Sequence, residues 1–346
     1  MLRVLMTMAI GAILAGQARA ETLMVCAEGG ADYVTIEEAI AASSDGDVVE
    51  LCDGFYEAGL IQVLGKAITV RSAAGDASAV VLTARLYFEG TETIGSRLEN
   101  LTFRGHGGAW GPVGFINATP IVVGCVFEGN SATYFGGACL ISCGRGLVTP
   151  PARFVSCVFR GNAAQSGGAI WVGGADIEFE NCLFAGNRAR REDGGAIAFY
   201  GEGHVLSFLR CTVAGNDGPS GGAIFASGAE LTANQSILWG NSETNGPGLR
   251  LLWNTVADFR CSILDAERVA VLGGSVLNTT DVMPLDPEFC DPERSYRSPT
   301  IEGDYTLTSS SPAAAADCGF MGVEPVGCEP VSIELWTWSR TKASYR

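Results

Sequence analysis

The segment Asn181-Cys182-Leu183-Phe184-Ala185-Gly186-Asn187 recurs along the chain in recognisable copies. The copies share a short apolar run that is followed by Gly and then Asn, and they occupy residues 125–130, 157–162, 211–216 and 236–241, with a degenerate copy at 101–106. The Phe-type positions 103, 127, 159, 184, 213 and 238 are separated by 24, 32, 25, 29 and 25 residues. A repeat with a period in the twenties indicates an architecture of stacked coils.

The side-chain pattern around the repeat predicts strands that are joined by sharp corners. Side chains alternate along a strand, so Cys182 and Phe184 face the same way. Ile177 and Phe179 also face inward, but they occupy odd positions whereas Cys182 and Phe184 occupy even ones. The alternation must therefore shift by one residue, which requires a corner between Glu180 and Cys182. The Gly-Asn pair after the strand predicts a second corner, because both residues tolerate the left-handed backbone region.

A second marker, Gly-Gly-Ala, follows each copy and precedes another short strand. It begins at Gly136, Gly167, Gly194 and Gly221. Short strands, corners and this period predict an all-β, right-handed parallel β-helix solenoid, in which equivalent side chains stack as ladders. The predicted ladders are Phe127, Phe159 and Phe184 in the bore, Asn130, Asn162, Asn187, Asn216 and Asn241 at a corner, and Cys125, Cys157, Cys182, Cys211 and Cys261 with an interruption at Ser236.

These motifs resemble two known groups of proteins. The Phe-x-Gly-Asn and Gly-Gly-Ala-Ile pairing is similar to the repeats of chlamydial polymorphic outer-membrane proteins. The chain as a whole more closely resembles secreted bacterial right-handed parallel β-helix repeat proteins of the pectin-lyase-like superfamily. The motifs cover about residues 98–245, and the resemblance implies the fold rather than an activity.

The chain divides into five predicted parts. Residues 1–20 resemble a secretory signal peptide, with Arg3 before an apolar run and Ala18-Arg19-Ala20 at the end. Residues 21–60 are expected to form an N-terminal cap and the first strands, and residues 61–278 to form the coils. Residues 279–330 are expected to form a closing segment, which a tail at residues 331–346 follows. Thr35 and Glu38 make a capping box that predicts a short helix through Ala42. The resemblance implies that this helix plugs the first coil. The resemblance implies that the closing segment covers the last coil, and the tail is either a packed or disordered end or a sorting signal.

The net charge and the predicted secretion limit the classes of partner that the protein can bind. Removing Arg3 and Arg19 with the signal peptide leaves 20 basic and 38 acidic residues, a net charge of −18. Such a surface disfavours nucleic acids and anionic membranes, and it disfavours bare polyuronates unless calcium bridges the two. We expect a secreted, cell-surface or periplasmic protein with no transmembrane segment after signal cleavage.

All 12 Cys follow the predicted signal peptide, which is consistent with an oxidising compartment. Rungs about 4.8 Å apart hold stacked Cβ atoms farther apart than the roughly 3.5–4.5 Å of a disulfide, so we expect free thiols in the ladder. Cys26 and Cys52 are candidates for a disulfide that flanks the cap, and Cys318 and Cys328 for one at the other end. Cys139, Cys143 and Cys290 are left unassigned.

Candidate functional residues are few. Arg190, Arg191, Glu192 and Asp193 form a charged cluster that could serve a lyase with calcium-held carboxylates and a basic Arg, or could be a solvated loop with mutual ion pairs. His106 falls at the Asn position of the repeat and is expected to be a corner residue. His204 has no visible partner in the sequence.

Aromatic side chains offer a different type of site. Trp171 and Phe225 belong to a column with Leu140 and Ala198, which faces outward if Ile170 and its equivalents face inward. An outward aromatic column could stack sugars, and the alternative is ordinary packing between rungs beneath a loop.

The sequence therefore predicts a scaffold, adhesin-like or glycan-binding β-helix without catalysis and without a cofactor. The rival hypothesis is a polysaccharide lyase or glycoside hydrolase that acts on acidic polysaccharide, with calcium if it is a lyase. The expected partner is carbohydrate or another cell-surface component and not nucleic acid, and the oligomeric state is left open.

Overall fold

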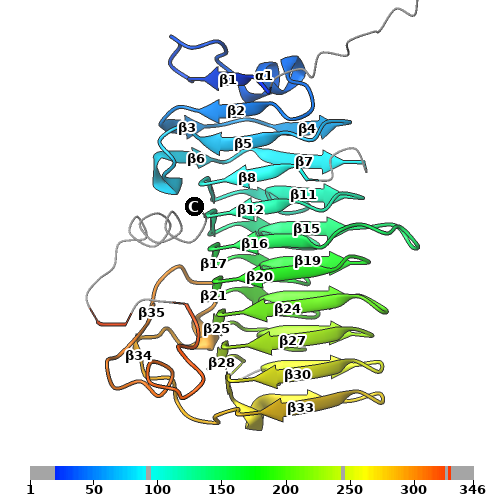
Figure 1. Ribbon diagram of the computed structural model, residues 1–346, viewed down its shortest axis with the longest axis vertical. Coiled ribbons are helices and arrows are strands. Elements are labelled where there is room, and N and C mark those ends of the chain that lie inside the picture. The colour runs from blue at the N-terminus through cyan, green and yellow to red at the C-terminus, as the bar shows by residue number, and fades with distance from the viewer. Residues whose placement is uncertain (1–19, 91–94, 243–245, 324–325, 329–346) are drawn as a thin grey trace, which may run out of the picture.

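Most of the chain winds into one elongated solenoid (Figure 1). The structure, a computed structural model, describes residues 20–90, 95–242, 246–323 and 326–328. The predicted signal peptide (residues 1–19 of it) and the tail at 331–346 lie outside the described residues. Helix is confined there to α1 (Ile36–Ala42) and to single 3-10 turns at Ala77–Ala79, Ala266–Arg268 and Ser295–Arg297.

Three long parallel sheets run the length of the solenoid. Sheet A contains, in spatial order, β1 (Thr22–Val25), β2 (Val48–Leu51), β5 (Thr69–Ser72), β8 (Arg97–Glu99), β12 (Ile121–Val123), β16 (Ala152–Val155), β20 (Ile177–Glu180), β24 (Val205–Leu209), β27 (Glu230–Asn234), β30 (Val256–Arg260) and β33 (Val276–Thr280). Sheet B contains β3 (Gly54–Tyr56), β6 (Val80–Leu82), β9 (Thr102–Arg104), β13 (Val126–Glu128), β17 (Val158–Arg160), β21 (Leu183–Ala185), β25 (Thr212–Ala214), β28 (Ile237–Trp239) and β31 (Ile263–Leu264). Sheet C contains β4 (Leu60–Leu64), β7 (Arg85–Glu89), β11 (Val113–Ile116), β15 (Cys139–Ser142), β19 (Ile170–Gly173), β23 (Ile197–Tyr200), β26 (Ile224–Ser227), β29 (Leu249–Leu252) and β32 (Val269–Val271).

Two smaller sheets complete the fold. Sheet D lies between B and C along the chain and contains β10 (Gly107–Gly108), β14 (Ser131–Ala132), β18 (Ala163–Ala164) and β22 (Arg188–Ala189). The antiparallel pair β34 (Phe289–Asp291) and β35 (Asp304–Leu307) lies beside the solenoid (Figure 1). Each coil visits sheets A, B and C in that order before the next coil begins, so the predicted all-β parallel β-helix is confirmed.

The corners occur where the sequence predicts them. Asn181, between β20 and β21, has a φ of 53°, which turns the chain between the two inward-facing phases. Gly186, after β21, has a φ of 59° and makes the second corner. Both values lie in the left-handed region that Asn and Gly adopt most easily.

Stacked phenylalanines fill the bore of the solenoid. Phe103, Phe127, Phe159 and Phe184 are fully buried, and successive ring centroids lie 5.1, 4.9 and 4.7 Å apart with nearly parallel planes. The strand pairing places Phe127, Phe159 and Phe184 at equivalent positions of adjacent rungs. The predicted Phe ladder is therefore present, and burial of each ring contributes roughly 1.5–3 kcal/mol to folding.

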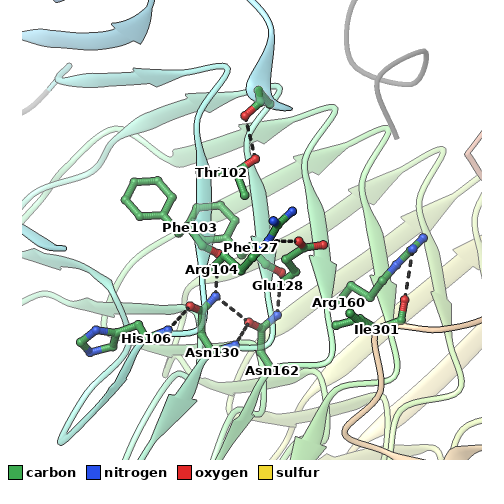
Figure 2. Close-up of polar contacts among 11 residues, drawn as sticks. Thr102, Phe103, Arg104, His106, Phe127, Glu128, Asn130, Arg160, Asn162 and Ile301 are labelled. Atoms are coloured by element: carbon green, nitrogen blue, oxygen red, sulfur yellow. Dashed lines mark hydrogen bonds and ion pairs between the residues drawn. The ribbon is translucent and has the colours of Figure 1, made fainter. Parts of the chain in front are cut away.

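A ladder of buried amides lies beside the phenylalanines (Figure 2). The Nδ2 of each Asn donates to the Oδ1 of the next, at 2.9 Å from Asn130 to Asn162 and 2.9 Å from Asn162 to Asn187. The same contacts continue to Asn216 and Asn241 at 2.9 and 3.0 Å. Each Nδ2 also donates to a backbone carbonyl of the preceding coil, such as that of Phe103. These buried polar groups are thus paired from rung to rung, as burial requires.

The Cys ladder is present for four of its five predicted members. Cys125, Cys157, Cys182 and Cys211 are buried free thiols, and the backbone N–H of Cys182 donates to the sulfur of Cys211 at 3.5 Å. Ser236 and Ser262 continue the column, because the N–H of Ser236 donates to Ser262 Oγ at 3.2 Å.

The prediction for Cys261 is wrong by one residue. Asn234 pairs with Arg260, so Cys261 is equivalent to Gln235 and lies at the outer corner rather than in the bore. Its φ of 46° matches the 49° of Gln235 and the 53° of Asn181 in the same corner column. The Cys-Ser order at positions 261 and 262 places the sulfur outside and the hydroxyl inside.

The N-terminal end of the solenoid is plugged as expected. Thr35 Oγ1 accepts from the N–H of Glu38 at 3.3 Å, and Ile36, Ala39 and Ile40 bury their side chains in the core. The helix packs against β1, β2 and β4. The predicted disulfide between Cys26 and Cys52 is present.

The C-terminal segment differs from what was expected. Residues 286–323, here called the cover segment, pack on the outer face of sheet B rather than over the last coil (Figure 1). Apolar residues from the two sides form one buried cluster, which includes Val126, Val158, Leu183, Ile237 and Ile263 from the coils and Phe289, Tyr305, Leu307 and Met321 from the cover segment. From β13 to β31, sheet B therefore buries both faces, one in the bore and one beneath the cover segment.

The predicted bond between Cys318 and Cys328 is wrong. Cys328 pairs with Cys290, across 5.3 Å between Cα atoms, and Cys318 is a free thiol. Cys290 lies in β34 of the cover segment, so this bond ties β34 to the stretch of chain that follows the segment. Cys139 and Cys143 are also free and buried.

Within the described ranges, no helix is both long enough and apolar enough to cross a membrane.

Candidate functional site

The outer face of sheet C presents aromatic side chains on neighbouring coils. Ile170 and Val172 point into the bore, so Trp171 between them points outward. In register, Trp171 lies between Leu140 and Ala198, and Ala198 lies beside Phe225. The column proposed from the sequence is therefore formed in this register.

The members of this column are not equally exposed. Phe225 is 4% exposed, whereas Trp171 is partly exposed. Tyr200, which the sequence did not single out, packs between them, with ring centroids 5.8 Å from Trp171 and 5.3 Å from Phe225. Phe135 lies on the other side of Trp171 at 5.2 Å. Trp171, Tyr200 and Phe135 are thus partly exposed, and the buried Phe225 packs against Tyr200.

An open groove of about 480 Å³ lies against these two rings. Gly173, Gly174 and Gly201 form part of its wall, and a β-carbon at Gly173 would lie 2.5 Å from the Trp171 ring. The polar lining residues are Ser142, Arg145, Glu202, His204 and Ser227. The groove therefore combines an aromatic floor, a glycine wall that leaves the ring accessible, and hydrogen-bonding groups around it.

His204 has a partner that the sequence did not reveal. Its Nδ1 lies 2.9 Å from Asp176 Oδ1, which also accepts the N–H of Val205 at 2.9 Å. Asp176 belongs to the preceding coil, 28 positions away. An acceptor at Nδ1 favours a proton on that nitrogen, which leaves Nε2 as the acceptor of a neutral ring.

The charged cluster at residues 190–193 is spread over several structural contacts. Arg190 donates to the carbonyl of Ala132 at 3.0 Å and to Ser131 Oγ at 2.8 Å, so it spans two coils. Glu192 accepts from Gln165 Nε2. Arg191 is exposed. These side chains do not converge on one space.

Asp193 connects this cluster with the aromatic groove. Tyr200 donates its hydroxyl to Asp193 Oδ2. Burial, and next the hydrogen bond to Asp193, raise the pKa of the Tyr200 hydroxyl. The hydroxyl therefore stays protonated at physiological pH and holds the ring in place as a donor.

His106 lies at the first step of the Asn ladder, as expected (Figure 2). Its backbone N–H donates to Asn130 Oδ1 at 3.0 Å, in the way that each Asn donates to the next. Desolvation lowers the pKa of its imidazole. It is a corner residue at the end of the ladder.

Metal ligands are not grouped in the part of the chain that the structure describes. There, no three His, Cys, Asp or Glu side chains lie close enough together to hold a metal ion.

Comparisons with known proteins give a match to one family model and several similar solved structures. Residues 124–142 match the Chlamydia polymorphic membrane protein repeat, which confirms the resemblance noted for the repeats. A search of curated protein sequences gives no match.

The solved structures similar to this chain include two polysaccharide lyases. Pectate lyase Pel9A is 10% identical, with 89% of this chain and 98% of that chain covered and a TM-score of 0.44. The PL6 family alginate lyase AlyGC, in a mutant form, is 12% identical, with 89% of this chain and 59% of that chain covered and a TM-score of 0.32. This chain thus spans about three fifths of AlyGC.

Proposed function

We propose that this protein is a secreted or cell-surface β-helix that binds a carbohydrate chain in the groove on sheet C without cleaving it. The observation that carries the proposal is the partly exposed ring of Trp171 on the groove floor, beside Tyr200. The apolar face of a sugar ring packs well on such a platform, and its hydroxyls pair with polar groups at the edge.

The shape of the groove suits an extended ligand. Its lining comes from four successive coils, with Ser142 in β15, Gly173 in β19, Tyr200 in β23 and Ser227 in β26. At about 4.8 Å per rung, these coils span roughly 14 Å. A linear glycan that runs along the solenoid axis would contact Trp171 and Tyr200 with consecutive parts of its chain.

The rigidity of the platform favours binding. Tyr200 is fixed by Asp193, and Trp171 is held between Phe135 and Tyr200. Side chains that are already ordered lose little conformational entropy when a ligand binds. Disulfides and repeats similar to those of chlamydial membrane proteins support an extracellular or surface location.

The test is binding to a panel of neutral and acidic polysaccharides, with and without calcium, by isothermal titration or glycan array. Trp171→Ala should weaken binding by about tenfold or more, which corresponds to ~1.4 kcal/mol. Trp253→Ala is the matched control, because Trp253 is 67% exposed and does not line the groove. Equal affinity of Trp171→Ala and the wild type, with both folded by circular dichroism, would rule out the groove as the binding site.

A catalytic alternative has one specific observation in its favour, the orientation of His204 by Asp176 at the edge of the same groove. A His held in this way has the arrangement of a general base, and a lyase needs a base to remove a proton beside a uronate carboxylate. Arg145 on the groove lining could pair with that carboxylate.

Turnover separates the two functions. The release of unsaturated or reducing sugar ends is followed with the wild type and with His204→Gln. Turnover that His204→Gln abolishes, while binding is kept, would replace the binding proposal with a lyase or hydrolase. Binding without product release in both proteins supports the proposal.

A further inference from the structure

Two free cysteines from different parts of the fold meet at the surface of the solenoid. Cys261 lies at the corner between β30 and β31, and Cys318 lies in the cover segment. Both are partly exposed and pack at the edge of the same apolar cluster. The neighbouring Cys318 thiol is the main cause that raises the pKa of Cys261, to about 11.

The backbone around Cys318 is fixed on the neighbouring rung. Gln235, the equivalent of Cys261 one coil earlier, donates from Nε2 to the carbonyl of Cys318 at 2.8 Å. The carbonyl of Gln235 accepts the N–H of Gly322 at 2.7 Å. The segment that carries Cys318 is therefore anchored to Gln235 at Cys318 and at Gly322 before any covalent bond forms.

The rule that keeps the ladder thiols apart does not apply to this pair. Cys125, Cys157, Cys182 and Cys211 repeat along one column, where the rung spacing sets the separation of their Cβ atoms. Cys261 and Cys318 approach from two independent segments, so their separation is not tied to the rung.

We propose that Cys261 and Cys318 form a third disulfide, which staples the cover segment to the outer corner of the solenoid. The oxidant is a disulfide of the surrounding medium, such as a low-molecular-weight disulfide or the disulfide of an oxidoreductase. One cysteine thiolate attacks it to give a mixed disulfide and releases one thiol. The second cysteine thiolate then displaces the other thiol, so that two cysteine thiols are oxidised and one external disulfide is reduced.

The position of the bond gives it a structural purpose. Cys290–Cys328 joins two parts of the C-terminal region to each other and leaves that region tied to the coils by non-covalent contacts. A bond from Cys261 to Cys318 would fix it directly to the coil. The apolar outer face of sheet B would then stay covered even when the coils loosen locally.

Thiol counting tests the proposal on the full chain after export and incubation with oxidised glutathione. The protein is denatured without reductant and alkylated, and its mass is measured. The structure has 12 cysteines, of which two disulfides occupy four and eight are free. A third bond consumes two of these eight and leaves six alkylated thiols, whereas eight alkylated thiols would overturn the proposal.

Two variants sharpen the count. Cys318→Ser should raise the number of alkylated thiols by one, because it removes one cysteine and releases its partner. Cys139→Ser, the control, removes a buried thiol and should lower the number by one. A lower count in both variants contradicts the proposal. Peptide mapping of the unreduced wild type must also yield a peptide that links Cys261 with Cys318, and a link from either residue to another cysteine would contradict it.

Discussion

Single residues stabilise this fold because many of them contact a residue of the same type on the next rung. Phe184 is fully buried, stacks on Phe159 at 4.7 Å and meets Phe179 edge-on at 5.0 Å between ring centroids. Asn187 accepts two hydrogen bonds from Asn162 and donates to Asn216. Side chains of identical size and hydrogen-bonding capacity therefore satisfy one another without adjustment from coil to coil.

At this scale, Phe184→Ala should lower the free energy of unfolding by about 3–5 kcal/mol, because it opens a cavity in the middle of the stacked rings. Urea unfolding followed by fluorescence measures the change. Phe55→Ala is the control, since Phe55 is 52% exposed and should change stability by less than about 1 kcal/mol. Equal losses in the two variants would contradict the position of Phe184 in the bore.

The sequence predicts the ladder position of a residue well where the repeat is intact, and it fails where the pattern shifts by one residue. The repeat predicts the ladder positions of Phe127 and Asn130, and the structure confirms both. The residue type predicts a place for Cys261 in the Cys ladder, whereas the register places Ser262 in that column. Position in the strand, and not residue type, decides which way a side chain points, because neighbours alternate.

At the scale of elements, the cover segment is the part that the sequence could not position. Its contacts are with residues that lie far away in the chain, such as the hydrogen bond from the N–H of Thr300 to the carbonyl of Gly186 at 3.0 Å. No period relates the cover segment to the coils, so its position is predicted from the resemblance alone. The resemblance implies that the segment covers the last coil, whereas it packs on sheet B. The Asp176–His204 pair was missed for a similar reason, because its two members lie in different coils and outside the repeat.

The contact between the cover segment and the corners makes a specific prediction for two equivalent glycines. Gly186 and Gly129 have φ values of 59° and 63°, so replacement with Ala strains both by about 1–2 kcal/mol. A β-carbon at Gly186 would in addition collide with Thr300, whereas one at Gly129 would meet no atom within 4 Å.

Gly186→Ala should therefore destabilise the protein more than Gly129→Ala and should loosen the cover segment. Limited proteolysis measures the second effect as faster cleavage within residues 286–303. Equal cleavage rates in the two variants would mean that the cover segment does not rest on this corner.

At the scale of the whole molecule, the stacked coils form one continuous core, so groups that share a column should respond together. The apolar cluster runs without interruption from Leu23 in β1 to Leu264 in β31. Sheets A, B and C each join coils from both ends of the solenoid. A change in conditions that affects every buried thiol is therefore expected to act on the stability of the entire solenoid.

Alkaline pH is such a condition. Burial raises the pKa of Cys125, Cys139 and Cys182 above the ordinary value of 9.0. When the pKa of a thiol is higher in the folded than in the unfolded state, its protonated form contributes fully to the free energy of unfolding below the unfolded-state pKa. This contribution is lost as pH rises from the unfolded-state pKa toward the folded-state pKa. Each such thiol should lower the free energy of unfolding with a limiting slope of up to ~1.4 kcal/mol per pH unit as pH rises above the unfolded-state pKa. Urea unfolding between pH 8 and 10 measures the slope, and Cys182→Ala should reduce it by up to ~1.4 kcal/mol per pH unit. A slope that Cys182→Ala leaves unchanged would mean that the ladder thiols ionise as readily in the folded protein as in the unfolded chain.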